Sequence, residues 1–255
     1  MDRVIYTAMN GAARLDEHQS VLTNNMANVN TPGFREQIAM FRSVPLTQGE
    51  GLSTRVATVT STVGSSFASG VMQTTGRALD VALAGAGWFA IQASDGTEAY
   101  TRAGNFQLST GNELQSSSGQ AVLSDQNAPI VIPENASVTI GADGSITALG
   151  AGDQPNAIVN LGRIKLVSPD ERLLIRGDDG SFRLAPDANG QPAGAQAADP
   201  SLRVISGMIE SSNANPMAAM VGMIENSRRY EAQLQVMKNV DTNEQRANGI
   251  LAAAN

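Results

Sequence analysis

The chain has 255 residues, of which 42% are hydrophobic and 16% are charged, so it can bury a core in one large domain or two small ones. Its net charge of −7 and its lack of a basic stripe argue against a generic nucleic-acid binder. The absence of cysteine excludes disulfides and cysteine-ligated metals. No apolar run reaches the roughly 18–20 residues of a membrane span, and the N-terminus lacks the pattern of a cleaved signal peptide. We therefore expect no membrane insertion and, if the protein is exported, export without a cleaved signal.

The first segment, residues 5–29, is predicted to be a helix because apolar residues recur at steps of three and four. This spacing is typical of a coiled-coil seam, with one polar member at Gln19. The positions on the seam are Ile5, Ala8, Ala12, Leu15, Gln19, Leu22, Met26 and Val29. The Thr-Pro-Gly sequence at 31–33 is expected to end the helix, since proline disfavours a helical conformation in the residue before it.

Four asparagines, at positions 24, 25, 28 and 30, lie within seven residues at the end of this helix. One interpretation is ordinary capping by Asn28 or Asn30. Another is that Asn24, Asn25 and Asn28 bind neighbouring backbone in an assembly and fix the register between helices, as a buried asparagine does in a coiled coil. The two interpretations are compatible.

The middle of the chain is predicted to be β structure. Short apolar runs are separated by Asp-Gly pairs at 95–96, 143–144 and 179–180, which are strong hairpin signals. We expect residues 1–33 to form an N-terminal axial helix and turn, 34–75 an extended connector with short strands, 76–205 a central β domain, and 206–255 a C-terminal axial helix.

A second helical pattern runs from Pro216 to Leu251, with Asn213 and Asn215 as candidate caps before the proline. Its apolar stripe comprises Met217, Met220, Ile224, Tyr230, Leu234, Met237, Val240, Ala247 and Leu251. The predicted fold class is thus α+β, with a central all-β domain flanked by long terminal helices that pair as a coiled coil. A two-helix hairpin cannot cover every apolar face, so the helices are expected to need partners from other chains.

Catalytic chemistry finds little support in the sequence. His18 is the only histidine, which rules out a cluster of histidine ligands for a metal, and we interpret it as a packing or surface residue. Gly85 and Gly87 match a phosphate-binding loop only weakly, and the three Asp-Gly aspartates are better explained by turns than by a catalytic pair. The methionines of the last 50 residues suit helix packing rather than a cofactor site. We predict no catalytic, cofactor-binding or metal-binding residue.

Three blocks of the sequence resemble the axial proteins of the bacterial flagellum, the rod and hook family. The first is "NNMANVNTPGFR" at 24–35, the second begins "TGRALDVALAGAGWFAIQ" and spans 75–123, and the third begins "GMIESSNANP" and spans 207–245. Their order and separation cover nearly the whole chain. Within the family the length and the opening residues favour a proximal rod subunit, with a distal rod subunit or another axial protein as the alternative.

The resemblance implies a structural subunit of the basal-body rod, located in the periplasm and exported by the flagellar type III apparatus. Its implied partners are copies of itself and neighbouring proximal and distal rod subunits, with no nucleic acid, membrane or cofactor. The expected assembly interface comprises Ile5, Ala8, Ala12, Leu15, Leu22, Asn24, Asn25, Met26, Asn28, Val29, Pro32, Gly33, Phe34, Asn213, Met220, Ile224, Tyr230, Leu234 and Met237.

Two other classes of protein remain as alternatives. A passive β-rich surface protein would share the strands, but it would not need helices at both ends of the chain. A carbohydrate-active enzyme would need a carboxylate pair in an aromatic cleft, and aromatic residues make up only 4% of this chain. Co-assembly with rod subunits distinguishes the three classes.

Overall fold

The computed structural model describes residues 2–45, 56–60, 64–150, 157–186, 190–191 and 193–253. The chain forms two compact units. We call residues 1–29, 36–66 and 214–255 the helical unit, and residues 30–35 and 67–213 the β-rich unit. Because both long helices are terminal and the strands lie between them in sequence, the predicted α+β class is confirmed.

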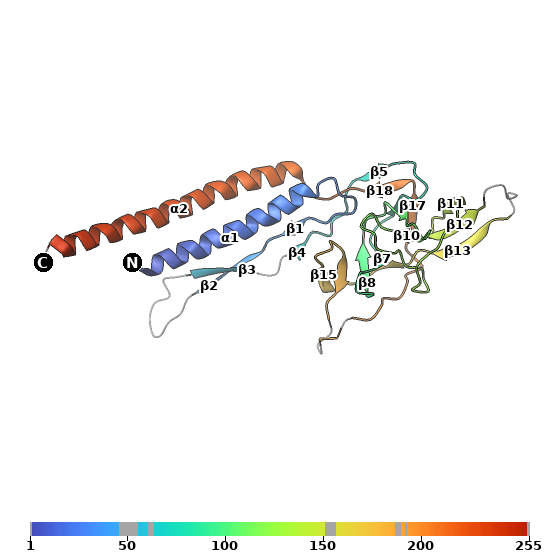
Figure 1. The fold of residues 1–255 in the computed structure, drawn as a ribbon, viewed down its shortest axis with the longest axis horizontal. Coiled ribbons are helices and arrows are strands. Elements are labelled where there is room, and N and C mark those ends of the chain that lie inside the picture. Colours follow the sequence, from blue (N-terminus) through green and yellow to red (C-terminus); the bar gives the residue numbers. More distant parts are fainter. Residues whose placement is uncertain are drawn as a thin grey trace. The chain divides into compact units, whose positions relative to one another are not determined.

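In the helical unit, α1 (Asp2–Ala27) and α2 (Pro216–Ala253) lie side by side and run antiparallel (Figure 1). The helix α2 begins where the sequence predicted. The Asn215 side chain accepts hydrogen bonds from the backbone N–H groups of Met217 and Ala218, at 3.0 and 3.2 Å. These bonds satisfy two of the donors that the first turn of a helix leaves free. The prediction that Asn213 caps this helix is wrong, because its side-chain amide donates to the carbonyl oxygen of Ala68 instead.

Four short strands also belong to the helical unit. Strand β1 (Gln37–Ile38) pairs with β4 (Gly64–Ser65), and β2 (Phe41–Pro45) pairs with β3 (Val56–Thr60), both in antiparallel fashion. The predicted connector at 34–75 therefore contains the short strands that we expected, although its residues 46–55 and 61–63 lie outside the described part of the chain.

The β-rich unit contains a five-stranded antiparallel sheet in the order β14-β7-β8-β16-β15. These strands are β14 (Leu166–Val167), β7 (Trp88–Gln92), β8 (Glu98–Thr101), β16 (Phe182–Leu184) and β15 (Leu174–Arg176), the last preceded by the short helix η1 (Glu171–Leu173). A three-stranded sheet joins β11 (Ser137–Ile140), β12 (Ser145–Leu149) and β13 (Val159–Arg163).

Three two-stranded pairs complete the β-rich unit. They are β5 (Met72–Thr74) with β18 (Met208–Glu210), β6 (Val81–Leu83) with β17 (Val204–Ser206), and β9 (Gln107–Leu108) with β10 (Leu114–Gln115). Two of these pairs join strands more than 100 positions apart in the sequence. The long segment 67–213 of the β-rich unit therefore begins and ends near paired strands, β5 and β18.

The three predicted Asp-Gly hairpins are confirmed, and they share one local geometry. In each turn the glycine has a φ between 79° and 86°, which suits a residue without a Cβ atom. In each turn the aspartate carboxylate accepts both the backbone N–H and the hydroxyl of the residue two positions later, at 2.6 to 3.1 Å. These later residues are Thr97, Ser145 and Ser181. The aspartates therefore serve turn chemistry, as the sequence indicated.

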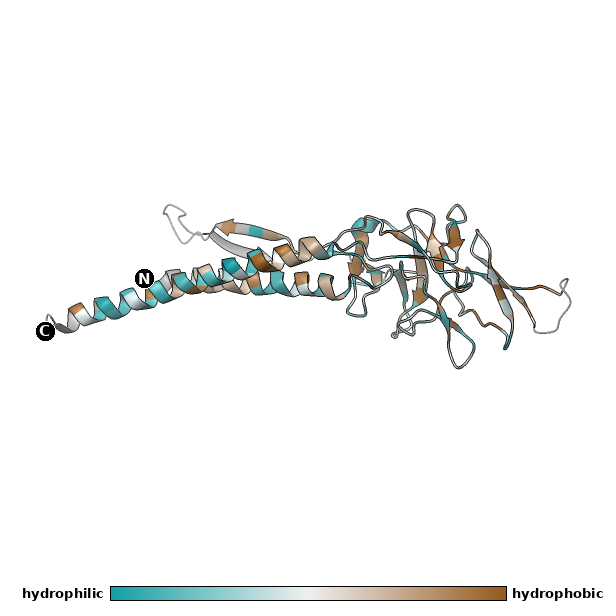
Figure 2. Ribbon diagram, turned by 90° about the horizontal axis from the view of Figure 1, so that it is seen from above, coloured by the Kyte–Doolittle hydropathy of each residue, from teal (hydrophilic) through white to brown (hydrophobic). Residues whose placement is uncertain are grey.

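Hydrophobic residues mark the strands of the β-rich unit, whereas both helices carry a mixture of polar and apolar positions (Figure 2). One core cluster surrounds Phe89, Ile91 and Phe106, and a second surrounds Trp88, Tyr100 and Phe182. The Trp88 and Phe182 rings lie 4.9 Å apart between centroids. As Trp88 is the only tryptophan and is buried in this unit, its fluorescence reports on the folding of the β-rich unit alone.

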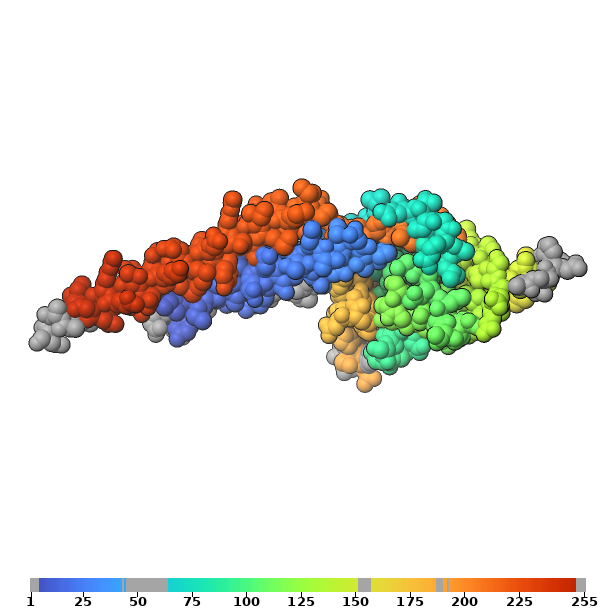
Figure 3. All heavy atoms as spheres, turned by 45° about the horizontal axis from the view of Figure 1, so that its top comes forward, coloured from blue at the N-terminus to red at the C-terminus, as the bar shows by residue number. Residues whose placement is uncertain are grey.

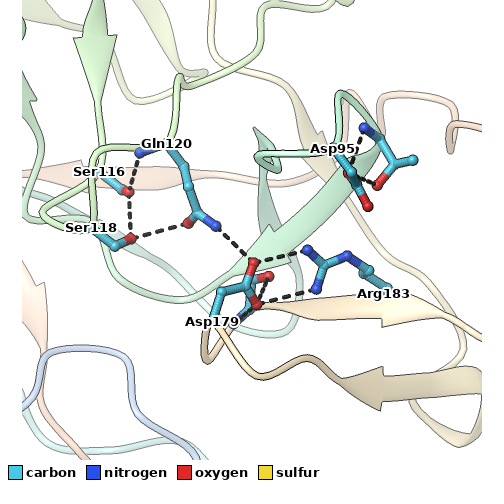
Figure 4. A network of polar contacts seen from close by, with 8 residues as sticks. Asp95, Ser116, Ser118, Gln120, Asp179 and Arg183 are labelled. Atoms are coloured by element: carbon cyan, nitrogen blue, oxygen red, sulfur yellow. Dashed lines mark hydrogen bonds and ion pairs between the residues drawn. The ribbon is translucent and has the colours of Figure 1, made fainter.

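A polar network joins the β15–β16 turn to the loop at 116–120 (Figure 4). The Asp179 carboxylate binds the Arg183 guanidinium at 2.8 Å and accepts a hydrogen bond from the Gln120 amide at 2.9 Å. Partial burial raises the pKa of Asp179, but the hydrogen bonds from Arg183 and Ser181 outweigh burial and lower this pKa to about 2. The folded state thus favours the charged carboxylate.

This depressed pKa predicts a specific acid sensitivity. The Asp179 pKa falls from 3.8 to about 2 on folding, so its stabilising contribution is complete above about pH 4 and is lost as the pH falls towards 2. We expect Asp179→Asn to lower the free energy of unfolding by about 1 kcal/mol at pH 7 and by much less at pH 2.5. Urea unfolding followed by Trp88 fluorescence measures both values. Asp125→Asn is the control, and an equal loss at both pH values would contradict the assignment.

Candidate assembly interface

The predicted seam of α1 lies against α2. Ala8 and Ala12 are buried, and the remaining seam residues with described side chains are half-buried. Small residues allow close packing of the two helices. A Cβ atom built on Gly222 of α2 would lie 3.2 Å from the Leu22 side chain, and one built on Gly11 of α1 would lie 3.4 Å from Gln233. The predicted seam positions of α1 are thus buried or half-buried, and Leu15, Gln19 and Leu22 among them contact α2.

The inward face of α2 agrees with the predicted apolar stripe at Met237, Val240 and Ala247 and differs from it nearer the start of the helix. Ala219 and Asn226 are buried, and the half-buried positions with described side chains are Pro216, Gly222, Met223, Gln233, Met237, Val240, Glu244 and Ala247. Of the expected interface residues on this helix, only Met237 is half-buried, whereas Met220, Ile224, Tyr230 and Leu234 are exposed. Between residues 219 and 226 the buried positions are taken by a small residue and a bonded amide, which allow close approach of the two helices.

Asn226 is the polar centre of the helix pair. Its Nδ2 donates to the carbonyl oxygen of Leu15 at 2.8 Å and to Oε1 of Gln19 at 2.9 Å. Its Oδ1 lies 3.2 Å from Nδ1 of His18. The ring of His18 also makes an edge-to-face contact with the ring of Phe41. The interpretation of the single histidine as a packing residue is therefore confirmed. A buried amide with three partners holds the helices in one register.

The face of α2 that points away from α1 is uncovered in the chain (Figure 3). Over its first turns the exposed apolar side chains are Met217, Met220, Val221 and Ile224, with exposed fractions of 66%, 39%, 54% and 56%. These four residues recur at helical spacing, so they form one patch, which we call the outer patch. Single exposed hydrophobic residues are ordinary, but a contiguous helical patch is typical of an interaction surface.

The asparagine cluster has two distinct roles within the chain. Asn25 is buried, its Nδ2 donates to the carbonyl oxygen of Gln37 at 2.9 Å, and its Oδ1 accepts the Gln37 N–H at 2.8 Å. Its carboxamide therefore pairs with the first residue of β1 as a neighbouring strand would. The Asn28 side chain donates to the carbonyl oxygen of Asn24 at 2.9 Å, one turn earlier, and the backbone N–H of Asn28 donates to the same oxygen at 3.1 Å. Asn24 itself is exposed.

The remaining expected residues of the N-terminal block are divided between the units. Val29 is half-buried at the end of the helical unit, whereas Pro32, Gly33 and Phe34 belong to the β-rich unit. Gly33 has a φ of 69°, and its N–H donates to the carbonyl oxygen of Glu210 at 2.7 Å. Phe34 is buried beneath the guanidinium of Arg176, 4.4 Å from the ring centroid.

Sequence reasoning missed three charged residues of the β-rich unit. Arg35, Arg102 and Glu210 are all buried, and both arginines form ion pairs with the glutamate. Arg35 lies in the block "NTPGFR" and Glu210 in the block "GMIESSN". Each is the only charged residue of its block, and this was the available signal that it has a specific role. Opposite charges 175 positions apart could not be paired from spacing alone.

The described helices include none that combines the length and hydrophobicity of a membrane span. Among the described side chains we also find no group of three that could hold a metal ion.

Three segments of the chain match flagellar families. Residues 5–35 match the family described as flagella basal body rod protein, residues 82–148 the D1 domain of flagellar hook protein FlgE/F/G, and residues 205–250 the C-terminal region of flagellar basal body rod FlgEFG protein. The chain is also 44% identical to flagellar basal-body rod protein FlgF of Salmonella typhimurium over 252 residues, which covers 99% of both chains. The chain belongs to the flagellar basal-body rod protein family.

Within this family the chain is close to FlgF. FlgF of Escherichia coli is likewise 44% identical over 99% of both chains. The basal-body rod protein FlgG of Bacillus subtilis is 37% identical, but over 127 residues that cover 45% of this chain and 48% of that protein. The chain is therefore a structural rod protein of the flagellar basal body, and the alternative of a FlgG-type subunit is weaker.

The pairing of Asn25 with Gln37 predicts a local effect in this rod protein. Asn25→Ala would leave the N–H and the carbonyl of Gln37 without these partners, at a cost of about 1–3 kcal/mol. We expect amide hydrogen exchange at Gln37 to accelerate by at least tenfold. Asn24→Ala is the matched control, because it removes an exposed carboxamide from the adjacent position. Unchanged exchange at Gln37 in the Asn25 variant would show that the pairing does not hold β1.

Proposed function

We propose that this rod protein is a FlgF-type subunit of the proximal rod that assembles helically through its terminal helices and transmits torque. The observation that carries the proposal is the outer patch on α2. The helix pair is complete on its inner side, where Asn226 and the small residues meet α1, yet apolar side chains remain exposed on the other side. Burying them requires another chain.

The partners that suit the outer patch are helices of neighbouring copies and of adjacent proximal and distal rod subunits. Apolar side chains at steps of three and four can insert between the side chains of a facing helix, as in a coiled coil. Tyr230 and Leu234 are also partly exposed, at 40% and 37%, but they lie farther along α2 and on another side of the helix from the outer patch. The expected interface residues on α1, including Asn24 and Asn28, remain part of this proposal.

The proposal gives each part of the chain a role. The axial helices, predicted at 1–33 and 206–255, form contacts along the rod, with the connector at 34–75 between the first helix and the central domain at 76–205. The subunit reaches the periplasm through the flagellar type III export apparatus before it assembles. The family blocks at both helices and in the central region support this division.

The substitution Ile224→Asp tests the outer patch. Ile224 is 56% exposed, so we expect the variant chain to fold normally with unchanged Trp88 fluorescence. In a rod the new carboxylate would be desolvated, at a cost of several kcal/mol per subunit. We expect at least a tenfold drop in basal bodies that carry a rod and hook, and a loss of swimming.

Val131→Asp is the control, since Val131 is 54% exposed but lies in the β-rich unit. Co-sedimentation of each purified variant with neighbouring rod subunits provides a second measurement in solution. Normal rods and normal co-sedimentation of the Ile224 variant would exclude the outer patch from assembly.

A further inference from the structure

The chain passes between its two units four times, after residues 29, 35, 66 and 213. If the subunit transmits torque, as proposed above, the load between the units travels through these four connections. All four adjoin three short segments of the β-rich unit, at 30–35, 67–72 and 208–213. How these segments are held therefore determines how the connections share a load.

Glu210 lies in the third segment and contacts both of the others. Its Oε1 lies 2.8 Å from Nη2 of Arg35 and accepts the backbone N–H of Gly70 at 2.8 Å. Its backbone carbonyl accepts the N–H of Gly33 at 2.7 Å, and within β18 it pairs with Met72 of β5. The first and second segments are thus both bonded to one residue of the third.

The carboxylate is also joined to the body of the β-rich unit. Its Oε2 lies 3.3 Å from Nη1 of Arg102, which also donates to the carbonyl oxygen of Gly85 at 2.7 Å. The side chains of Glu210, Arg35 and Arg102 are 1%, 0% and 3% exposed. Nε, Nη1 and Nη2 of Arg35 make no hydrogen bond in the described part of the chain, so the ion pair with Glu210 is the contact that compensates this buried charge.

Close backbone contacts surround the same residue. A Cβ atom on Gly70 would lie 2.0 Å from the carbonyl oxygen of Ser211, and one on Gly33 would lie 2.2 Å from the backbone nitrogen of Ala103. The Asn213 amide donates to the carbonyl oxygen of Ala68 at 2.8 Å. Gly70 is therefore required for the close contact between the second and third segments, and Gly33 for the close contact of the first segment with residues 102–103.

We propose that Glu210 is a positioning residue that locks the three connecting segments together, so that a load arriving through one connection is shared by the others. The charge is central to this role. Only a carboxylate can compensate Arg35 and Arg102 and still accept the Gly70 N–H. Without this lock each connection would bear its load separately.

The test is Glu210→Gln, which keeps the size and the acceptor for Gly70 but removes the charge. In the purified full chain we expect amide exchange at Gly33 and Gly70 to accelerate at least tenfold more than exchange in β7 and β8. Glu134→Gln, an exposed site in the same unit, is the control. Uniform acceleration throughout the β-rich unit, or none, would overturn the lock.

A second measurement separates positioning from general stability. Ile146→Ala, in the buried core, serves as a destabilised comparison with an intact Glu210. We expect flagella with the Glu210 variant to rotate at normal speed under low load. In tethered cells, where the load is high, we expect them to lose at least half of their rotation speed and to show broken rods. Flagella with the Ile146 variant should have the same speed relative to wild type at both loads. Equal load dependence in the two variants would overturn the proposal.

If the Glu210→Gln chain does not fold, Glu210→Asp keeps the charge on a shorter side chain, and the same exchange criterion applies to it. The exchange test needs only the isolated chain, so it does not depend on rod assembly. Absence of the wild-type chain from purified basal bodies would instead contradict the proposed function and leave the exchange result standing.

Discussion

A charged group can be buried only if opposite charges and hydrogen bonds replace the water that it loses. Glu210 meets this requirement through contacts with residues that are distant in sequence. Its partners come from the N-terminal block, from the glycine before β5 and from the body of the β-rich unit. Removal of Glu210 would leave both buried arginines without this carboxylate. The β-rich unit therefore depends on residues 30–35, although the five strands of its main sheet lie between residues 88 and 184.

The fold was predictable where a feature is local in sequence. Each Asp-Gly hairpin depends on a glycine φ and on an aspartate that accepts hydrogen bonds from the residue two positions ahead, so three consecutive residues supply the signal. The two helices were predictable because apolar spacing and a capping asparagine lie within the segments themselves. The extents of the helices followed from the same local signals, to within about three residues at each end.

The site was predictable only in part, because its contacts are distant in sequence. Spacing selected an apolar stripe on α2 but could not tell that a polar residue, Asn226, would face α1 while Ile224 faced outward. Asn25 was singled out by its place in the asparagine cluster, yet its partner Gln37 lies beyond a proline and a glycine. The family resemblance located the three blocks that contain Arg35, Arg102 and Glu210 without indicating that these residues are in contact.

The register that Asn226 imposes has a consequence for any polymer of this chain. A slip of α2 by one turn, about 5.4 Å, would bring Met223 or Tyr230 to the position of Asn226 and separate the amide from Leu15 and Gln19. The helix pair thus has one setting in every copy. In a filament, small differences in geometry between subunits would add up along its length as errors of pitch and curvature. One buried amide per chain would limit such errors, because it fixes the axial register of α1 and α2 in each copy.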